Sequence, residues 1–171
     1  MRVGPLTDSS LVTRNLGTAR MALCASPDYI ARHGAPKSLD ELAEHCCVSH
    51  PTTTWNFRTE DGIREIRMNP RMISNDMDMI RKMVLSGFGI GAAPQILVSE
   101  DVKAGRLIPL LPKTPFVERT FYLVYPSRRE PPSKVVAFID HFIAASQPVP
   151  PWELINDVFR TNEPVEQPEP V

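Results

Sequence analysis

The stretch that decides the fold lies at the start of the chain and reads Arg2-Val3-Gly4-Pro5-Leu6-Thr7-Asp8-Ser9-Ser10-Leu11-Val12. A short apolar strand enters a Gly-Pro turn, passes a polar loop, and leaves through a second apolar strand that ends in Leu23-Cys24-Ala25-Ser26-Pro27-Asp28-Tyr29. Ser26 and Pro27 are typical of a helix start, as N-cap and first helical residue. Such a passage is what a strand crossing between two lobes requires.

Beyond this stretch, short apolar strands alternate with helical segments, which indicates an α/β fold. We predict strands at residues 21–24, 46–49, 71–74, 89–93 and 120–125, and a hairpin from residues 55–58 and 63–68 around Asp61-Gly62. Helices are predicted at residues 27–34, 38–44, 75–86, 95–103 and 132–145.

The composition of the 171 residues is that of one ordinary domain or two small lobes. The longest apolar runs are far shorter than a membrane span, and no secretory apolar region follows the first residues. Three cysteines, two of them adjacent, do not indicate a disulfide framework, so we expect a reducing cytoplasm.

Charge is unevenly distributed along the chain. Residues 147–171 carry five acidic residues against one arginine, a net charge of −4, and six of the 18 prolines. The remaining residues carry 18 basic and 15 acidic side chains, a net charge of +3. This excess is too small and too scattered for a DNA-binding surface, so no direct DNA binding is expected. The tail is expected to be partly disordered.

The opening stretch resembles the effector-binding domain of LysR-type transcriptional regulators, at the point where a first-lobe strand crosses into the second lobe. The resemblance covers residues 1–146 in the family's order and continues through residues 31–42, 55–57, 75–76, 87–94, 105–111 and 124–129. It implies a periplasmic-binding-protein-like (type 2) bilobal α/β fold. The family's winged helix-turn-helix and the first half of its first lobe are absent from this pattern.

From this resemblance we expect four parts along the chain. Residues 1–16 are a residual strand and crossover of a first lobe truncated at its N-terminal side, and residues 17–93 are a complete second lobe. Residues 94–146 return to the first lobe, and residues 147–171 form the Pro/Glu-rich tail. The strands near Val3 and at 120–125 are expected to expose edges, which predicts marginal stability or self-association.

A cleft between the lobes is the expected ligand site. Asn75, next to Asp76, stands at a helix start, where a plain N-cap is the favoured local interpretation. The resemblance implies that this loop borders the cleft, where free N–H groups can meet a small anion. The resemblance implies that Val3, Gly4, Pro5 and Leu6 line the first-lobe wall and that Pro94 and Gln95 lie at the hinge. Thr53 and Trp55 are candidates for the second-lobe wall, with Trp55 alternatively in the core.

Other chemistry is less well supported by the residues. The glycines at 87, 89 and 91 follow a helix and open a strand, the reverse of a phosphate-binding loop, so we interpret them as close helix–strand packing. A zinc cluster of His45, Cys46, Cys47 and His50 requires adjacent strand cysteines to face one metal, so buried cysteines are the favoured interpretation. No nucleophile elbow or paired carboxylates are present, so neither enzyme activity nor a cofactor is expected.

The predicted function is that of an effector-sensing fragment of a LysR-type regulator, which binds a small anionic metabolite and controls transcription in the full-length protein. Expected partners are the effector and a second copy or a full-length regulator, without a membrane. Two alternatives remain open. One is a solute-binding module, which would need an export signal, and the other is an interaction protein that pairs with full-length regulators.

Overall fold

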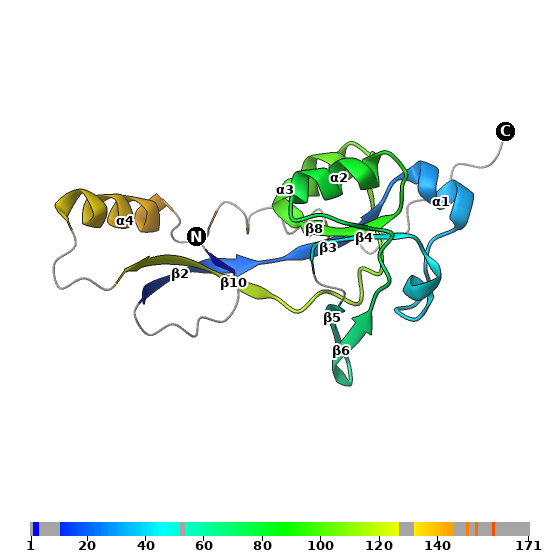
Figure 1. Cartoon of the computed structure of the whole chain (residues 1–171), viewed down its shortest axis with the longest axis horizontal. Helices are drawn as coiled ribbons and strands as arrows, with labels where there is room; N and C mark the ends of the chain where they lie inside the picture. Colours follow the sequence, from blue (N-terminus) through cyan, green and yellow to red (C-terminus); the bar gives the residue numbers. More distant parts are fainter. Residues whose placement is uncertain are drawn as a thin grey trace.

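Two β-sheets form the framework of the molecule, and the chain passes between them twice (Figure 1). The computed structural model describes residues 2–3, 11–51, 54–126, 132–145, 150, 153 and 159. The first passage joins β2 (Leu11–Ala19) to β3 (Met21–Ala25), and the second leads from β9 (Ile108–Pro109) to β10 (Arg119–Pro126). The predicted crossing strand is therefore present, as a strand that leaves one sheet and continues in the other.

The smaller sheet has three antiparallel strands, in the order β1 (Arg2–Val3), β10, β2. The β10–β2 register runs from Arg119 opposite Ala19 to Pro126 opposite Leu11, with one irregularity at Phe121/Tyr122. The prediction of an open edge at residues 120–125 is wrong, because β10 is bonded on both sides. In the described part of the chain, the edge strands of this sheet are β1 and β2.

The larger sheet has five strands in the order β7-β4-β8-β3-β9. At its centre, β8 (Ile90–Pro94) is parallel to β4 (Cys47–Ser49) and antiparallel to β3, and β7 (Met72–Ile73) is parallel to β4. Helices α2 (Met77–Leu85) and α3 (Gln95–Lys103) lie together on one face, and the hairpin of β5 (Thr54–Thr59) and β6 (Gly62–Arg67) projects on the other side (Figure 1).

The segment after β8 stays with the larger sheet. Helix α3 contacts β8 and β3, and β9 pairs with β3, with Cys24 opposite Pro109. The open side of β3 is filled by the returning chain, since the Leu110 N–H donates to the Leu23 carbonyl at 2.8 Å. Residues 95–109 therefore belong to the five-stranded sheet and its helices, and the return to the smaller sheet begins later, at β10.

Side chains of β3 alternate between two apolar clusters, one on each face of the larger sheet. Leu23 and Ala25 join the cluster that contains Tyr29, Trp55 and Phe57. Ala22 and Cys24 face the other cluster, where the buried residues include Ile80 and Val84 of α2 and Val98 of α3. The predicted apolar face of the helix at residues 75–86 is confirmed, since Met77 and Met83 pack against the same cluster.

The predicted starts of α1 and α3 agree with the structure, whereas the segment after Ser38 and the start of α2 differ from prediction. Helix α1 (Pro27–His33) begins after Ser26, whose Oγ accepts a hydrogen bond from the Tyr29 N–H at 3.2 Å, and ends at Gly34 with φ of 75°. The segment after Ser38 forms only a 3₁₀ turn, η1 (Glu41–Glu44). The N-cap of α2 is Asp76 and not Asn75, because the Asp76 carboxylate reaches the first-turn N–H groups.

The glycine run packs as predicted. Gly87 follows α2 with φ of 73°, a conformation that favours glycine. A Cβ on Gly91 would lie 2.5 Å from a Val84 methyl group of α2, so only glycine allows the helix to lie this close to β8. The run is therefore a packing feature of α2 and β8.

Helix α4 (Ser133–Ala145) lies on the side of the smaller sheet, away from α2 and α3 (Figure 1). It was predicted at residues 132–145, and the structure confirms it. Ile139 is buried, whereas Phe138 is 59% exposed and Val136 is 39% exposed. Helix α4 therefore presents apolar side chains to solvent.

Candidate functional site

A groove lies where both passages of the chain connect the two sheets. Its volume is about 610 Å³, and it lies between the β2–β3 passage, the start of α3 and the returning segment 109–118. We call it the hinge groove; its lining residues are Arg20, Met21, Ala22, Leu23, Gln95, Pro109, Leu110, Leu111, Pro112, Lys113, Thr114, Pro115, Phe116, Glu118 and Phe159. Concave sites where two structural units meet are common ligand sites.

Two of the groove's charged residues come from the two passages and pair with each other. Arg20 follows β2 and Glu118 precedes β10, and the Arg20 Nε donates to Glu118 Oε1 at 2.6 Å. Both side chains are partly exposed, at 37% and 47%. The β2–β10 register, which places Ala19 opposite Arg119, brings them together. Lys113 contributes a second positive charge to the groove.

Gln95 lies at the start of α3 and has an unusual side chain. Its backbone N–H donates to the Arg20 carbonyl at 2.9 Å, which fixes the helix start against the first passage. Its side-chain Oε1 is buried and has no hydrogen-bond partner in the described part of the chain. Pro94 precedes it as N-cap, without a side-chain capping bond. A buried unpaired acceptor is costly, so Gln95 Oε1 is a candidate ligand contact.

Trp55 does not line the hinge groove. It is 5% exposed, and its indole N–H donates to Ser49 Oγ at 3.3 Å. It lies edge-on to Phe116, with ring centroids 5.9 Å apart, and Phe116 forms part of the groove wall. The core alternative for Trp55 is therefore the observed one, and the tryptophan supports the groove from behind.

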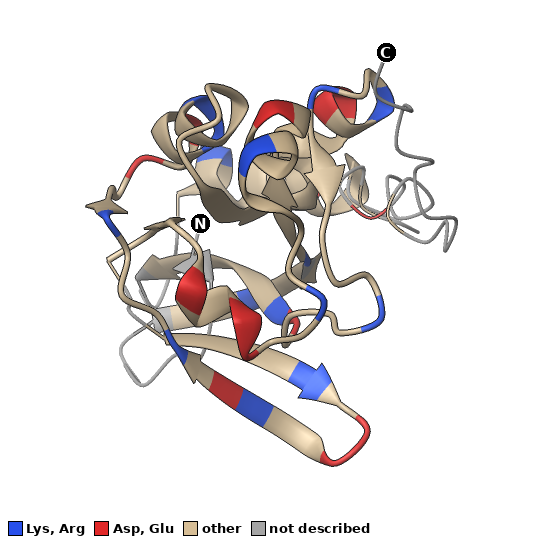
Figure 2. Cartoon of the chain, turned by 90° about the vertical axis from the view of Figure 1, so that its right-hand side faces the viewer, with Lys and Arg blue, Asp and Glu red and all other residues tan. Residues whose placement is uncertain are grey.

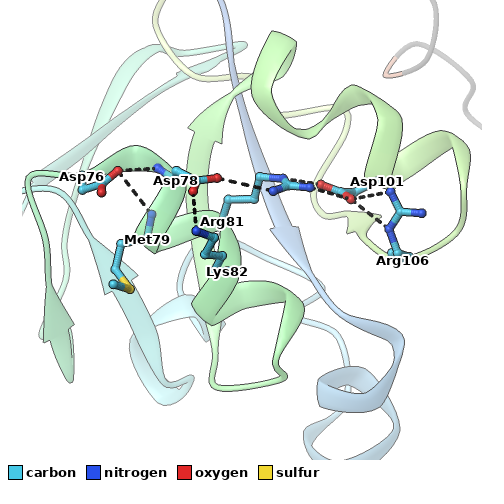
Figure 3. A network of polar contacts seen from close by, with 7 residues as sticks. All are labelled: Asp76, Asp78, Met79, Arg81, Lys82, Asp101 and Arg106. Carbon is cyan, nitrogen blue, oxygen red and sulfur yellow. Dashed lines mark hydrogen bonds and ion pairs between the residues drawn. The ribbon is translucent and has the colours of Figure 1, made fainter.

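The N-terminus of α2 is already occupied by a carboxylate. Asp76 Oδ1 accepts hydrogen bonds from the N–H groups of Asp78 at 2.9 Å and Met79 at 3.4 Å (Figure 3). Asp78 adds a second negative charge, although Lys82 pairs with it at 2.7 Å. Two of the N–H groups beside Asn75 are thus bonded to Asp76, whose negative charge opposes an anion at this helix start.

The remaining predicted site residues are only partly covered by the described structure. Gly4, Pro5, Leu6 and Thr53 lie outside the described residues, and Val3 is described as a strand residue opposite Phe121. Asn75 is exposed, at the start of α2. Of the predicted set, Gln95 lines the groove and Pro94 adjoins it. Sequence reasoning missed Arg20, Lys113 and Glu118, although pairing of the two predicted passages would have placed Arg20 beside Glu118.

A buried ion-pair network ties α2 to α3. Asp101 is fully buried and accepts hydrogen bonds from Arg81 Nε at 2.5 Å and Nη2 at 3.0 Å, and from Arg106 Nε at 2.9 Å and Nη2 at 2.7 Å (Figure 3). Burial alone raises the pKa of Asp101, but the hydrogen bonds and charges of the two arginines outweigh it and lower that pKa. This network fixes α3, whose first residue is Gln95.

Of the two adjacent cysteines predicted to be buried, Cys47 is buried and Cys46 is only partly buried. Cys24 and Cys47 are buried as predicted, and burial raises the pKa of each thiol to about 12. Nearby, the Tyr29 hydroxyl lies 3.0 Å from His45 Nδ1 and accepts a hydrogen bond from the Cys46 N–H at 3.1 Å. Within the described residues, no group of three or more His, Cys, Asp or Glu side chains could hold a metal ion.

Along the ribbon of Figure 2, basic and acidic positions are interspersed, and both occur on the projecting hairpin. Among the described helices, none is long and apolar enough to cross a membrane.

Comparisons with known proteins identify the family. Residues 1–147 match the LysR substrate binding domain. The chain is 33% identical over 148 residues to the HTH-type transcriptional regulator CrgA of Neisseria meningitidis serogroup C (strain 8013), covering 84% of this chain and 49% of CrgA. It is 32% identical over 156 residues to the HTH-type transcriptional regulator DmlR of Escherichia coli (strain K12), covering 86% of this chain and 50% of DmlR. The chain thus spans about half the length of the curated relatives it matches.

Solved structures agree with the sequence comparison. The regulatory domain of variant C227S AphB from Vibrio vulnificus superimposes with a TM-score of 0.75 at 31% identity, covering 85% of this chain and 73% of that domain. The regulatory domain of CrgA from Neisseria meningitidis superimposes with a TM-score of 0.68 at 31% identity, covering 82% of this chain and 71% of that domain. The predicted periplasmic-binding-protein-like (type 2) fold class is confirmed. The chain belongs to the LysR substrate binding domain family.

Proposed function

We propose that this chain senses a small anionic metabolite between its two lobes and, within a LysR-type regulator, controls transcription. The supporting observation is the hinge groove, whose walls come from both passages between the sheets. A ligand that contacts both passages favours one relative position of the sheets, and this shifts the population of conformers. We propose a non-enzymatic role in the cytoplasm, because the relatives reported above are bacterial regulators of transcription.

The chemistry of the groove supports a small acid that also carries a hydrogen-bond donor. Arg20 and Lys113 give two positive charges against one negative charge on Glu118. A guanidinium has five N–H donors, so Arg20 can hold Glu118 through Nε and offer others to a carboxylate. Gln95 Oε1 needs a donor, which a hydroxyl or amino group supplies. Hydroxy acids and amino acids therefore fit better than simple carboxylates.

The test is calorimetric titration of the purified chain with lactate and with propionate, which lacks the hydroxyl. We expect lactate to bind and propionate to bind about tenfold more weakly, since one hydrogen bond contributes about 1.4 kcal/mol. Arg20→Gln and Gln95→Ala should each weaken lactate binding at least tenfold. Lys103→Gln removes the same charge at the other end of α3 and should leave binding unchanged. If Arg20→Gln, Gln95→Ala and Lys103→Gln all bind lactate with equal affinity, the hinge groove is not the binding site.

Pairing with a second regulator chain remains a proposal. It is favoured by the exposed Phe138 and Val136 on α4 and by the edges of β1 and β2. We expect the sedimentation coefficient to rise with protein concentration, and Phe138→Ser to weaken this association. The matched change Ile63→Ser, at a hairpin residue that is 69% exposed, should have no effect. A concentration-independent monomer would contradict the proposal.

A further inference from the structure

The C-terminal segment extends beyond the family match at residue 147 and still contacts the domain. Pro150 is buried, and the Glu153 N–H donates to its carbonyl at 2.8 Å. Glu153 Oε1 accepts a hydrogen bond from the Thr18 N–H at 2.6 Å. Thr18 belongs to the edge strand β2 and lies two residues before Arg20. The carboxylate of Glu153 therefore satisfies a backbone donor on the first passage between the sheets.

Phe159, a described residue of the same segment, lines the hinge groove. Its side chain lines the groove together with Arg20, Ala22 and Gln95. It also packs against the apolar cluster that contains Ala22, Val98 and Leu107. An aromatic ring that is partly buried on one wall of an open groove occupies space that a ligand of that groove would use.

Long-range charge favours this contact as well. Residues 147–171 carry a net charge of −4, and the rest of the chain carries +3. Opposite net charges of this size give a weak attraction, which salt reduces further.

We propose that the C-terminal segment is an intramolecular competitor for the hinge groove, with Phe159 as the competing group and Glu153 as its tether to β2. The inference rests on the proposed function, because it assigns the groove to a ligand. If Phe159 occupies the groove in part of the population, only the remaining molecules can bind ligand. The apparent dissociation constant then equals the intrinsic one divided by the fraction of molecules with an open groove. The segment therefore sets the effector concentration to which the domain responds.

Hydrogen exchange tests the contact without any ligand. In Phe159→Ala, the backbone amides of residues 20–23 and Gln95 should exchange faster than in the wild type. In Glu153→Ala, the Thr18 amide should do so. Ile63→Ala shortens an exposed apolar side chain on the hairpin and serves as the control. Unchanged exchange in both tail variants overturns the inference.

Titration with 3-phenyllactate tests the competition. This probe carries a hydroxy acid and the phenyl ring that Phe159 presents. We expect Phe159→Ala to bind it about tenfold more tightly than the wild type, by analogy with the burial of one aromatic side chain. The affinity of Ile63→Ala should equal that of the wild type. High salt should narrow the difference between wild type and Phe159→Ala.

The outcomes separate this inference from the proposed function. Equal affinity of wild type and Phe159→Ala for 3-phenyllactate overturns the competition and leaves the groove as a ligand site. If neither lactate nor 3-phenyllactate binds any variant while the exchange difference persists, the proposed function fails and the competition fails with it. Tighter binding by Phe159→Ala, together with faster exchange, supports both.

Discussion

Replacing Asp101 with alanine is expected to lower the free energy of unfolding by about 3–5 kcal/mol, the usual cost of removing one partner of a buried ion pair. The Asp101 side chain is 1% exposed and holds both Arg81 and Arg106. Without it, the Arg81 guanidinium, only 25% exposed, remains partly desolvated beside α3. Urea unfolding at pH 7 measures the change.

The matched control is Glu100→Gln, one residue earlier on α3. Glu100 pairs with Lys103 at 2.8 Å, but its side chain is 76% exposed. An exposed pair of this kind contributes less than about 1 kcal/mol. If both variants lose a similar amount of unfolding free energy, burial does not make the Asp101 network stronger than the exposed Glu100–Lys103 pair.

The stability difference between the wild type and Asp101→Ala is also expected to depend on pH. Because the pKa of Asp101 is lowered in the folded state from its ordinary value of 3.8, its ionised form stabilises the fold. This contribution is fully present above the unfolded-state pKa and is lost as pH falls through the lower folded-state pKa. The difference in unfolding free energy between wild type and Asp101→Ala should therefore be constant from pH 7 to about 5 and shrink below about pH 4.

Gly89→Ala is the second change with a large expected effect. A Cβ at this position would lie 2.3 Å from the Cys46 carbonyl oxygen and 3.0 Å from its carbonyl carbon. The same oxygen accepts the Ile90 N–H at 2.8 Å, next to the parallel pairing of β4 and β8. Backbone atoms must move to admit the methyl group, so we expect a loss of about 3 kcal/mol in unfolding free energy.

Gly105→Ala separates the steric effect from the backbone effect. Gly105 has φ of 70°, and no atom of the described residues lies within 4 Å of its Cβ position. Only the conformational cost of a left-handed residue applies there, about 1 kcal/mol. Thermal unfolding of both variants gives the comparison. If Gly105→Ala is the more damaging change, the close approach of Gly89 to Cys46 does not limit the packing.

Much of the local structure was predictable because its signals lie within a few residues of each other. Ser26-Pro27 and Gly34 bound α1, Asp61-Gly62 mark the hairpin turn, and the spacing of Ile80 and Val84 gives the buried face of α2. The N-cap of α2 was placed one residue early, because Asn75 and Asp76 have nearly equal capping ability and only the backbone geometry distinguishes them.

The sequence by itself determined the α/β class, the order of the elements, the crossing strand and the family, since each depends on local periodicity or on a linear succession of motifs. The tertiary structure alone decided the hinge groove and the Asp101 network. Arg20 and Glu118 are 98 residues apart in the chain, and Thr18 and Glu153 are 135 apart. Contacts over such separations follow from strand register and helix packing, which no short stretch of sequence encodes.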